Sequence, residues 1–336
     1  MHIYIWSTQT RTTDEGVYAY LYQTTMSICC SYLRNEFRLK KFWLSDVHSA
    51  RFATFQWRLP PIVYLLYRLV IAVYADFWLI YTAVEYGSVA PGNGLYAWPV
   101  YLTNWTYTML CLYLTLHALT TLFFLCTSPA ILWWRRLPVS QHCALFTELE
   151  VHPSLWGDDY EPIPSHDNED GELTYGETST RSNLMPFYFK LVWVLLNIMS
   201  SCSVMVTLIF FIFLWPQMNT DNQPIDLGNL QLHGINSVIV FLECLLTAAP
   251  VHLLHFVFPL TYGIVYLVFT AIFYGAGNKD PIYPEVLDWN SDKVGQTMIM
   301  VLVVGFVILP LLQVFFFIIY RLKLWLYGWI SSRSSD

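Results

Sequence analysis

Residues 187–216 read FYFKLVWVLLNIMSSCSVMVTLIFFIFLWP, and this stretch decides the fold. Lys190 is its one charged residue, so the stretch exceeds the ~20 apolar residues that a helix needs to cross the hydrocarbon core of a bilayer. Because lipid offers the backbone no hydrogen-bond partner, a segment of this kind is expected to be helical. The stretch therefore predicts a transmembrane helix over about residues 187–215, ending at Trp215-Pro216.

Five other apolar segments of comparable length predict further spans, at about 60–84, 97–127, 233–251, 256–276 and 295–320. The composition agrees, because only 12% of the residues are charged, against about 25% in a soluble domain. Aromatic residues reach 18%, which suits a protein with two membrane–water interfaces. The sequence thus predicts an all-α polytopic membrane helix bundle with six transmembrane helices. No broad basic face is present, so nucleic acid is not an expected partner.

The spans divide the chain into five parts. We expect a cytoplasmic N-terminal segment (1–59), spans 1–2 (60–127), an acidic cytoplasmic loop (128–186), spans 3–6 (187–320) and a cytoplasmic tail (321–336). The loop is polar and rich in turn-forming residues, so it is predicted to be disordered. It acts either as a solvated linker or as a docking segment for cytoplasmic protein partners.

The distribution of basic residues predicts the topology. The N-terminal segment, the loop between spans 2 and 3 and the C-terminus carry most of the Lys and Arg. The three opposite connections, at 85–96, 216–232 and 277–294, hold only Lys279 and Lys293. Because basic residues accumulate on the cytoplasmic side, both termini are predicted to be cytoplasmic. The protein is then expected in the plasma membrane or an endomembrane.

The N-terminus and the cysteines add little chemistry. MHIYIWSTQT lacks the basic start and the apolar run of a signal peptide, and Met26 offers a second start that would make residues 1–25 an extension. The seven cysteines show no metal-binding spacing, so neither a metal nor a cofactor is expected. Adjacent Cys29 and Cys30 are either palmitoylation sites or ordinary reduced thiols.

Three chemically able side chains are predicted to meet at the non-cytoplasmic face. Thr103 lies a few residues into span 2, His233 opens span 4, and Asp288 lies in an outer loop. A threonine hydroxyl becomes a nucleophile when a neutral histidine accepts its proton. Asn104 and Asn236 could then stabilise an oxyanion, and Asp288 or Asn236 could orient the imidazole. The alternative is structural, because a threonine in a membrane helix often bonds the carbonyl one turn back.

Three further ionisable groups lie within predicted spans: Asp76, His117 and Glu243. Charge in lipid is costly, so these side chains are expected to face the interior of the bundle. They form either a polar pocket or proton path, or hydrogen bonds that hold helices together.

Several motifs carry a resemblance to a known family. EFRLKKFWLS, FQW, YLLYRLVIA, YLTNWTYTML, LHGINSVIVFLE and IYPEVLDWN, spread over residues 26–325, resemble rolling stone proteins. That resemblance implies a multispan membrane protein linked with myoblast fusion. The chain is more distantly similar to the androgen-induced six-span hydrolases of fatty acid esters of hydroxy fatty acids.

The hydrolase resemblance implies specific roles. It makes Thr103, in Tyr101-Leu102-Thr103, the nucleophile and His233 its base, and it also matches Tyr283-Pro284. One departure is Leu232, which stands where the hydrolases commonly carry Asn. Two functions therefore stay open: a non-enzymatic membrane protein of cell fusion, or an intramembrane threonine hydrolase of lipid esters. Membrane lipids, or a fatty ester substrate, are the expected partners.

Overall fold

The computed structural model describes residues 33–44, 47, 49–57, 59–89, 98–127, 185–219, 221, 223–284 and 286–333, and the statements below concern those residues. The predicted acidic loop and the Cys29-Cys30 pair lie outside them, apart from Met185 and Pro186 at the end of the loop.

Six apolar helical segments are long enough to cross a membrane, as predicted. They are α2 (Pro61–Val89); α4 (Leu102–Thr127); α7 (Phe187–Ile209) with η6 (Phe210–Leu214) and α8 (Trp215–Met218); α9 (Leu227–Leu230) with η7 (Gln231–Ile235) and α10 (Asn236–Leu246); η8 (Leu253–Phe256) with α11 (Val257–Gly275); and α12 (Val294–Val303) with η9 (Val304–Ile308) and α13 (Leu309–Arg333). No β-strand occurs among the described residues, which confirms the all-α prediction.

Local sequence sets where these helices begin. Proline is well suited to a first helical turn, and Pro61 opens α2. The carboxylate of Asp226 accepts a hydrogen bond of 2.8 Å from the backbone N–H of Asn229, so the fourth span begins before the predicted residue 233. Beyond α11 the chain turns at Gly277, whose φ of 106° favours glycine.

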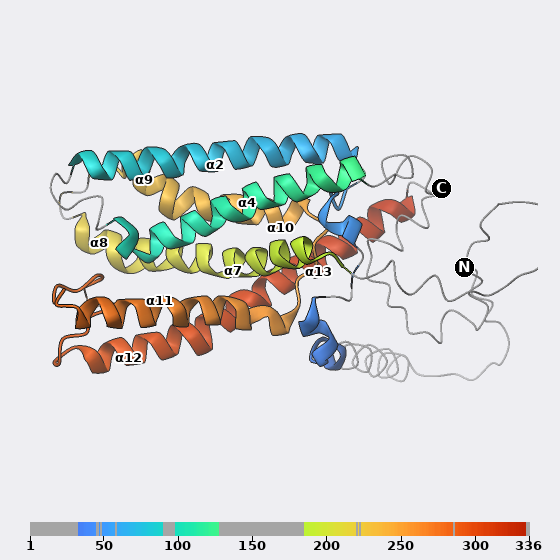
Figure 1. Cartoon of the computed structure of the whole chain (residues 1–336). Helices are drawn as coiled ribbons and strands as arrows, with labels where there is room; N and C mark the ends of the chain where they lie inside the picture. Colours follow the sequence, from blue (N-terminus) through green and yellow to red (C-terminus); the bar gives the residue numbers. More distant parts are fainter. Residues whose placement is uncertain are drawn as a thin grey trace, which may run out of the picture.

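Helix α7 lies at the centre of the bundle and contacts α4, α10, α11 and α13, while α2 packs on the outside of α4 (Figure 1). Small side chains allow this close packing, because Ser200, Ser201, Cys202 and Ser203 of α7 are all buried. Nearer the start of α7, the indole N–H of Trp193 donates to the carbonyl of Pro250 over 2.8 Å. Helix α7 therefore connects α4, α10, α11 and α13 within one bundle.

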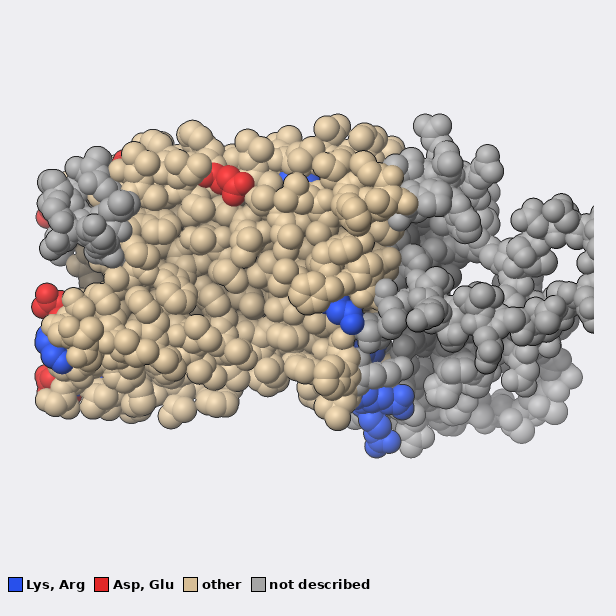
Figure 2. All heavy atoms as spheres, viewed as in Figure 1, with Lys and Arg blue, Asp and Glu red and all other residues tan. Residues whose placement is uncertain are grey.

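The first span begins and the last span finishes at the same end of the bundle (Figure 1). In Figure 2 the charged side chains gather mainly at the two ends, and a broad uncharged surface lies between them. Such a surface is what a lipid bilayer requires. Which end faces the cytoplasm stays a prediction from the distribution of basic residues.

The segment before the first span packs into the bundle. It contains η1 (Leu39–Trp43) and η2 (Ser49–Phe52), and the side chain of Phe52 is fully buried. Arg51 donates to the carbonyl of Ala248 over 2.9 Å and to the hydroxyl of Tyr320 over 2.7 Å. These bonds tie the segment to the connection after α10 and to α13.

Candidate functional site

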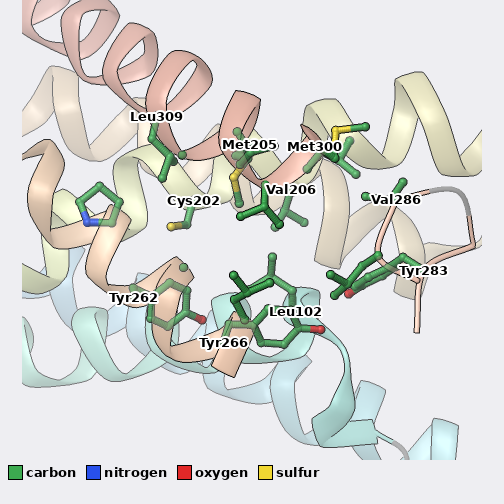
Figure 3. Close-up of a pocket in the computed structure, with 18 of the residues that line it drawn as sticks. Leu102, Cys202, Met205, Val206, Tyr262, Tyr266, Tyr283, Val286, Met300 and Leu309 are labelled. Atoms are coloured by element: carbon green, nitrogen blue, oxygen red, sulfur yellow. The ribbon is translucent and has the colours of Figure 1, made fainter. Parts of the chain in front are cut away.

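A cavity of about 190 Å³ lies between α7, α11 and the α12–η9 segment. Its walls are almost entirely aliphatic and aromatic, and Figure 3 shows Tyr262 and Tyr266 on one side, opposite Met205, Met300 and Leu309. Because all three surrounding segments belong to candidate membrane spans, the cavity lies within the membrane region of the bundle. An apolar cavity with a few polar groups is the usual form of a small-molecule site.

Each of the three π-helical turns in the described part of the chain contributes to this cavity. Phe210 comes from η6, His233 from η7 and Gly305 from η9. Gly305 allows close packing there, because a Cβ at that position would stand 3.3 Å from the side chain of Leu260. Single π-helical turns occur frequently at functional sites. Their convergence marks this cavity as the candidate site.

The polar end of the cavity is formed by Thr103 and the loop between α11 and α12. Tyr283 of that loop is partly buried, and its buried hydroxyl lies close to the hydroxyl groups of Thr103 and Tyr266. Burial raises the pKa of Tyr283 above its ordinary value, and the neighbouring Thr103 and Tyr266 groups act in the opposite direction. Tyr283 therefore remains protonated at neutral pH and keeps an O–H group available to donate.

His233 is buried in the same cavity wall. Its imidazole stacks on the ring of Phe210, with 3.6 Å between the ring centroids and 6° between the planes. Its Nδ1 atom has no hydrogen-bond partner in the described residues. Its backbone carbonyl accepts a hydrogen bond from Thr207 of α7, which fixes η7 against that helix.

The structure thus brings Thr103 and His233 into one cavity. Within the described residues, no hydrogen bond joins the hydroxyl of Thr103 to the imidazole of His233, and no side chain orients that imidazole by a hydrogen bond. A nucleophile and its base are usually within about 2.6–3.2 Å, although the distance is often longer without substrate.

The other predicted site residues lie elsewhere. The amide of Asn104 donates to the carbonyl of Trp98 over 2.6 Å, at the start of α4. The side-chain oxygen of Asn236 accepts from the backbone N–H of Ser237 over 2.5 Å. Asp288 accepts from the backbone N–H of Asn290 over 2.9 Å. None of these three residues lines the cavity, and their oxyanion and orienting roles stay predictions.

Sequence reasoning missed the tyrosines. Tyr262 and Tyr266 are buried on α11, one helical turn apart, and both line the cavity. The hydroxyl groups of Tyr262, Tyr283 and Thr106 are buried without a hydrogen-bond partner of normal geometry in the described residues. Two tyrosines four residues apart in an apolar span were the available signal, because such residues share one face of a helix.

The three further ionisable groups predicted within the spans, Asp76, His117 and Glu243, do not line this cavity. Glu243 of α10 forms a buried ion pair with Arg68 of α2 and accepts a hydrogen bond of 2.6 Å from the hydroxyl of Tyr113 in α4. His117 bonds the carbonyl of Phe52 over 2.6 Å, and Asp76 accepts from Thr115 over 2.9 Å. These contacts join helices, as the structural alternative predicted.

Comparison with known proteins shows which family this sequence resembles. Residues 175–333 match the family model described as "Protein rolling stone". The chain is also 30% identical over 142 residues to "Protein rolling stone" of Drosophila melanogaster. Over residues 175–333 the chain is therefore similar to the rolling stone family.

The match to the Drosophila rolling stone protein covers 40% of this chain and 49% of that relative, so it spans about half of the relative's length. No solved structure matches the chain. The rolling stone region extends from α7 to α13, and it therefore contains His233, Tyr262, Tyr266 and Tyr283, whereas Thr103 precedes it. Most of the cavity wall thus lies within the family region.

Proposed function

We propose that this protein is a rolling stone family membrane protein that binds the acyl chain of a lipid in the cavity between α7, α11 and α12. The observation that carries the proposal is an apolar cavity within the membrane region that has hydroxyl groups at one end. Aliphatic walls accommodate a hydrocarbon chain, and the hydroxyl groups of Thr103 and Tyr283 can donate to an ester or carboxyl oxygen, whereas Tyr266 already donates to the carbonyl of Val100 over 2.8 Å.

Filling the cavity tests this proposal. Val301 lines the cavity, whereas the adjacent Leu302 is 56% exposed and lies outside it. Val301→Trp should occupy the space of the chain, and Leu302→Trp should place the same side chain on the lipid-facing surface. Native mass spectrometry of the protein released from detergent would then show bound lipid for wild type and Leu302→Trp but not for Val301→Trp. Equal lipid retention in all three proteins would contradict the proposal.

A role in cell fusion is proposed from the resemblance to proteins linked with myoblast fusion, and it favours the plasma membrane as the location. Surface biotinylation checks the location, and a fusion assay in cultured myoblasts checks the role. Cells that express wild type and Leu302→Trp should fuse to the same extent, whereas cells with Val301→Trp should fuse less. A normal extent of fusion with Val301→Trp at equal surface abundance would separate lipid binding from fusion.

Ester hydrolysis is a second candidate, favoured by the position of Thr103 and His233 in one cavity. If they act as nucleophile and base, Thr103→Ala and His233→Ala should each abolish cleavage of a fatty acid ester, and Thr106→Ala should not. The double variant should be no worse than either single variant, because residues that act as one unit are not additive. Labelling of the wild type, but not of Thr103→Ala, by a fluorophosphonate checks the nucleophile directly. Turnover that survives Thr103→Ala would exclude this mechanism.

A further inference from the structure

A second hollow lies on the surface of the bundle, on the other side of Tyr262. This groove has a volume of about 790 Å³ and lies between α4 and α11, with Val194 and Ile198 of α7 among its lining residues. Trp98 and Pro99 mark one end and Phe42 and Phe258 the other. Because most of its walls belong to candidate membrane-spanning helices, we expect the groove to face the acyl chains of the surrounding bilayer.

Among the described residues, Tyr262 alone lines both the groove and the cavity. Its side chain therefore forms the partition between bilayer and cavity. The hydroxyl of Tyr262 is buried and has no hydrogen-bond partner of normal geometry in the described residues. The neighbouring position Gly263 is open, because a Cβ there would meet no atom within 4 Å. The phenol of Tyr262 lies beside the hydroxyl of Thr106, but no hydrogen bond of normal geometry has to break when the Tyr262 side chain changes rotamer.

Trp105, another aromatic residue of the groove, is held differently. Trp105 donates its indole N–H to the carbonyl of Pro99, and its ring packs on Phe269 with a centroid separation of 5.0 Å. Trp105 is therefore a fixed part of the groove wall, whereas Tyr262 is held by packing and by a polar contact with Thr106 that lacks normal hydrogen-bond geometry.

We propose that the groove between α4 and α11 is a binding site for a single lipid acyl chain, and that the chain passes from this groove into the cavity when Tyr262 moves aside. The inference rests on the proposed lipid binding in the cavity and adds the route and the residue that controls it. The occupant is a bilayer acyl chain, because the groove opens to the hydrocarbon region and continues into the cavity at Tyr262.

Helix α11 offers a matched pair of positions for the test. Val265 is 54% exposed and lines the groove, whereas Val268 is 53% exposed and lines neither hollow. Val265→Trp should obstruct the groove, and Val268→Trp adds the same side chain at the same exposure one turn away. Thr108→Trp obstructs the groove from α4 and checks that the effect does not depend on α11.

The full-length protein in phosphatidylcholine vesicles would be exposed briefly to a fatty acid with a photoreactive diazirine in its chain. Peptide mapping then measures labelling near Met109 in the groove and near Met205 in the cavity. We expect cavity labelling to fall about tenfold in Val265→Trp and Thr108→Trp, a factor equivalent to about 1.4 kcal/mol, and to stay unchanged in Val268→Trp. Tyr262→Ala should increase the rate of cavity labelling.

Two results would overturn the inference in different ways. Cavity labelling that is unchanged in Val265→Trp and Thr108→Trp would show that the chain enters from another side, past the exposed residues Ile264 and Phe306. The proposed lipid binding would survive that result. Labelling of the groove without labelling of the cavity in wild type would instead contradict the proposed function itself.

Discussion

Arg68 and Glu243 are both fully buried and form an ion pair between α2 and α10. Around them, the hydroxyls of Tyr67 and Tyr113 each donate to the carboxylate of Glu243 over 2.6 Å. A buried pair of charges contributes little net stability, but the loss of one partner leaves the other charge in a region where it is poorly solvated. Replacing either Arg68 or Glu243 alone should therefore destabilise the bundle more than replacing both.

Glu243→Gln should consequently destabilise the bundle by about 3–5 kcal/mol, because it leaves the guanidinium of Arg68 without its counter-charge. The double variant Arg68→Met, Glu243→Met should lose much less, since neither charge remains. Asp76→Asn provides the control, because Asp76 is only partly buried and forms no ion pair within the described residues. Thermal unfolding in a mild detergent measures all three. A double variant as unstable as Glu243→Gln would refute the argument.

The sequence indicated which single residues were unusual but not how they pair. Glu243, Asp76 and His117 stood out as ionisable groups within apolar segments. Arg68, the partner of Glu243, comes from another span, and only packing reveals that the two meet. The same limit applies to the cavity. Thr103 and His233 were predicted to converge, whereas the position of Tyr262 between the cavity and the groove is visible only in the packed structure.

At the scale of elements, α7 owes its central place to small polar side chains. Ser201 is fully buried, and its hydroxyl donates to Gln313 of α13 over 3.4 Å. Gln313 in turn donates to the carbonyl of His252 over 2.8 Å. The small side chain of Ser201 thus permits a polar contact between two transmembrane helices.

Ser201→Leu should destabilise the bundle by about 1–3 kcal/mol, because it forces a larger side chain into a packed interface. Ser201→Ala is the matched control: it keeps the small volume, removes one long hydrogen bond and should lose no more than about 1 kcal/mol. Detergent-solubilised protein analysed by size-exclusion chromatography during a temperature series compares the variants. Equal stability of the two would show that this helix contact is not tightly packed.

Hydropathy predicted the six spans because burial in lipid demands long apolar segments, but it placed some ends incorrectly. The sixth span was expected to finish near residue 320, whereas α13 continues to Arg333. The reason lies at Lys323, which is buried and donates to the carbonyls of Cys244 and Thr247 over 2.7 and 2.6 Å. A buried lysine with carbonyl partners is compatible with a continuing helix, although its charge suggests an end.

For the whole molecule, the even number of candidate spans leaves both ends of the bundle on one side. The basic residues predict that this side is cytoplasmic. Epitope tags fused to the two termini should be protected from protease outside intact cells, and a tag inserted near Lys279 should be accessible. External access to either terminal tag would invert the topology and would place the Tyr283 loop on the cytoplasmic side.

The three π-helical turns have a consequence for comparing this chain with others. Each turn holds one residue more than regular α-helical geometry requires. Deletion of one residue from such a turn would restore the regular helix and rotate the following positions by about 100° relative to the preceding ones. A related chain without these three extra residues would keep the same hydropathy profile and the same six crossings, yet Phe210, His233 and Gly305 would no longer converge. Single-residue gaps inside aligned membrane helices would therefore distinguish relatives with the cavity from relatives that share only the architecture.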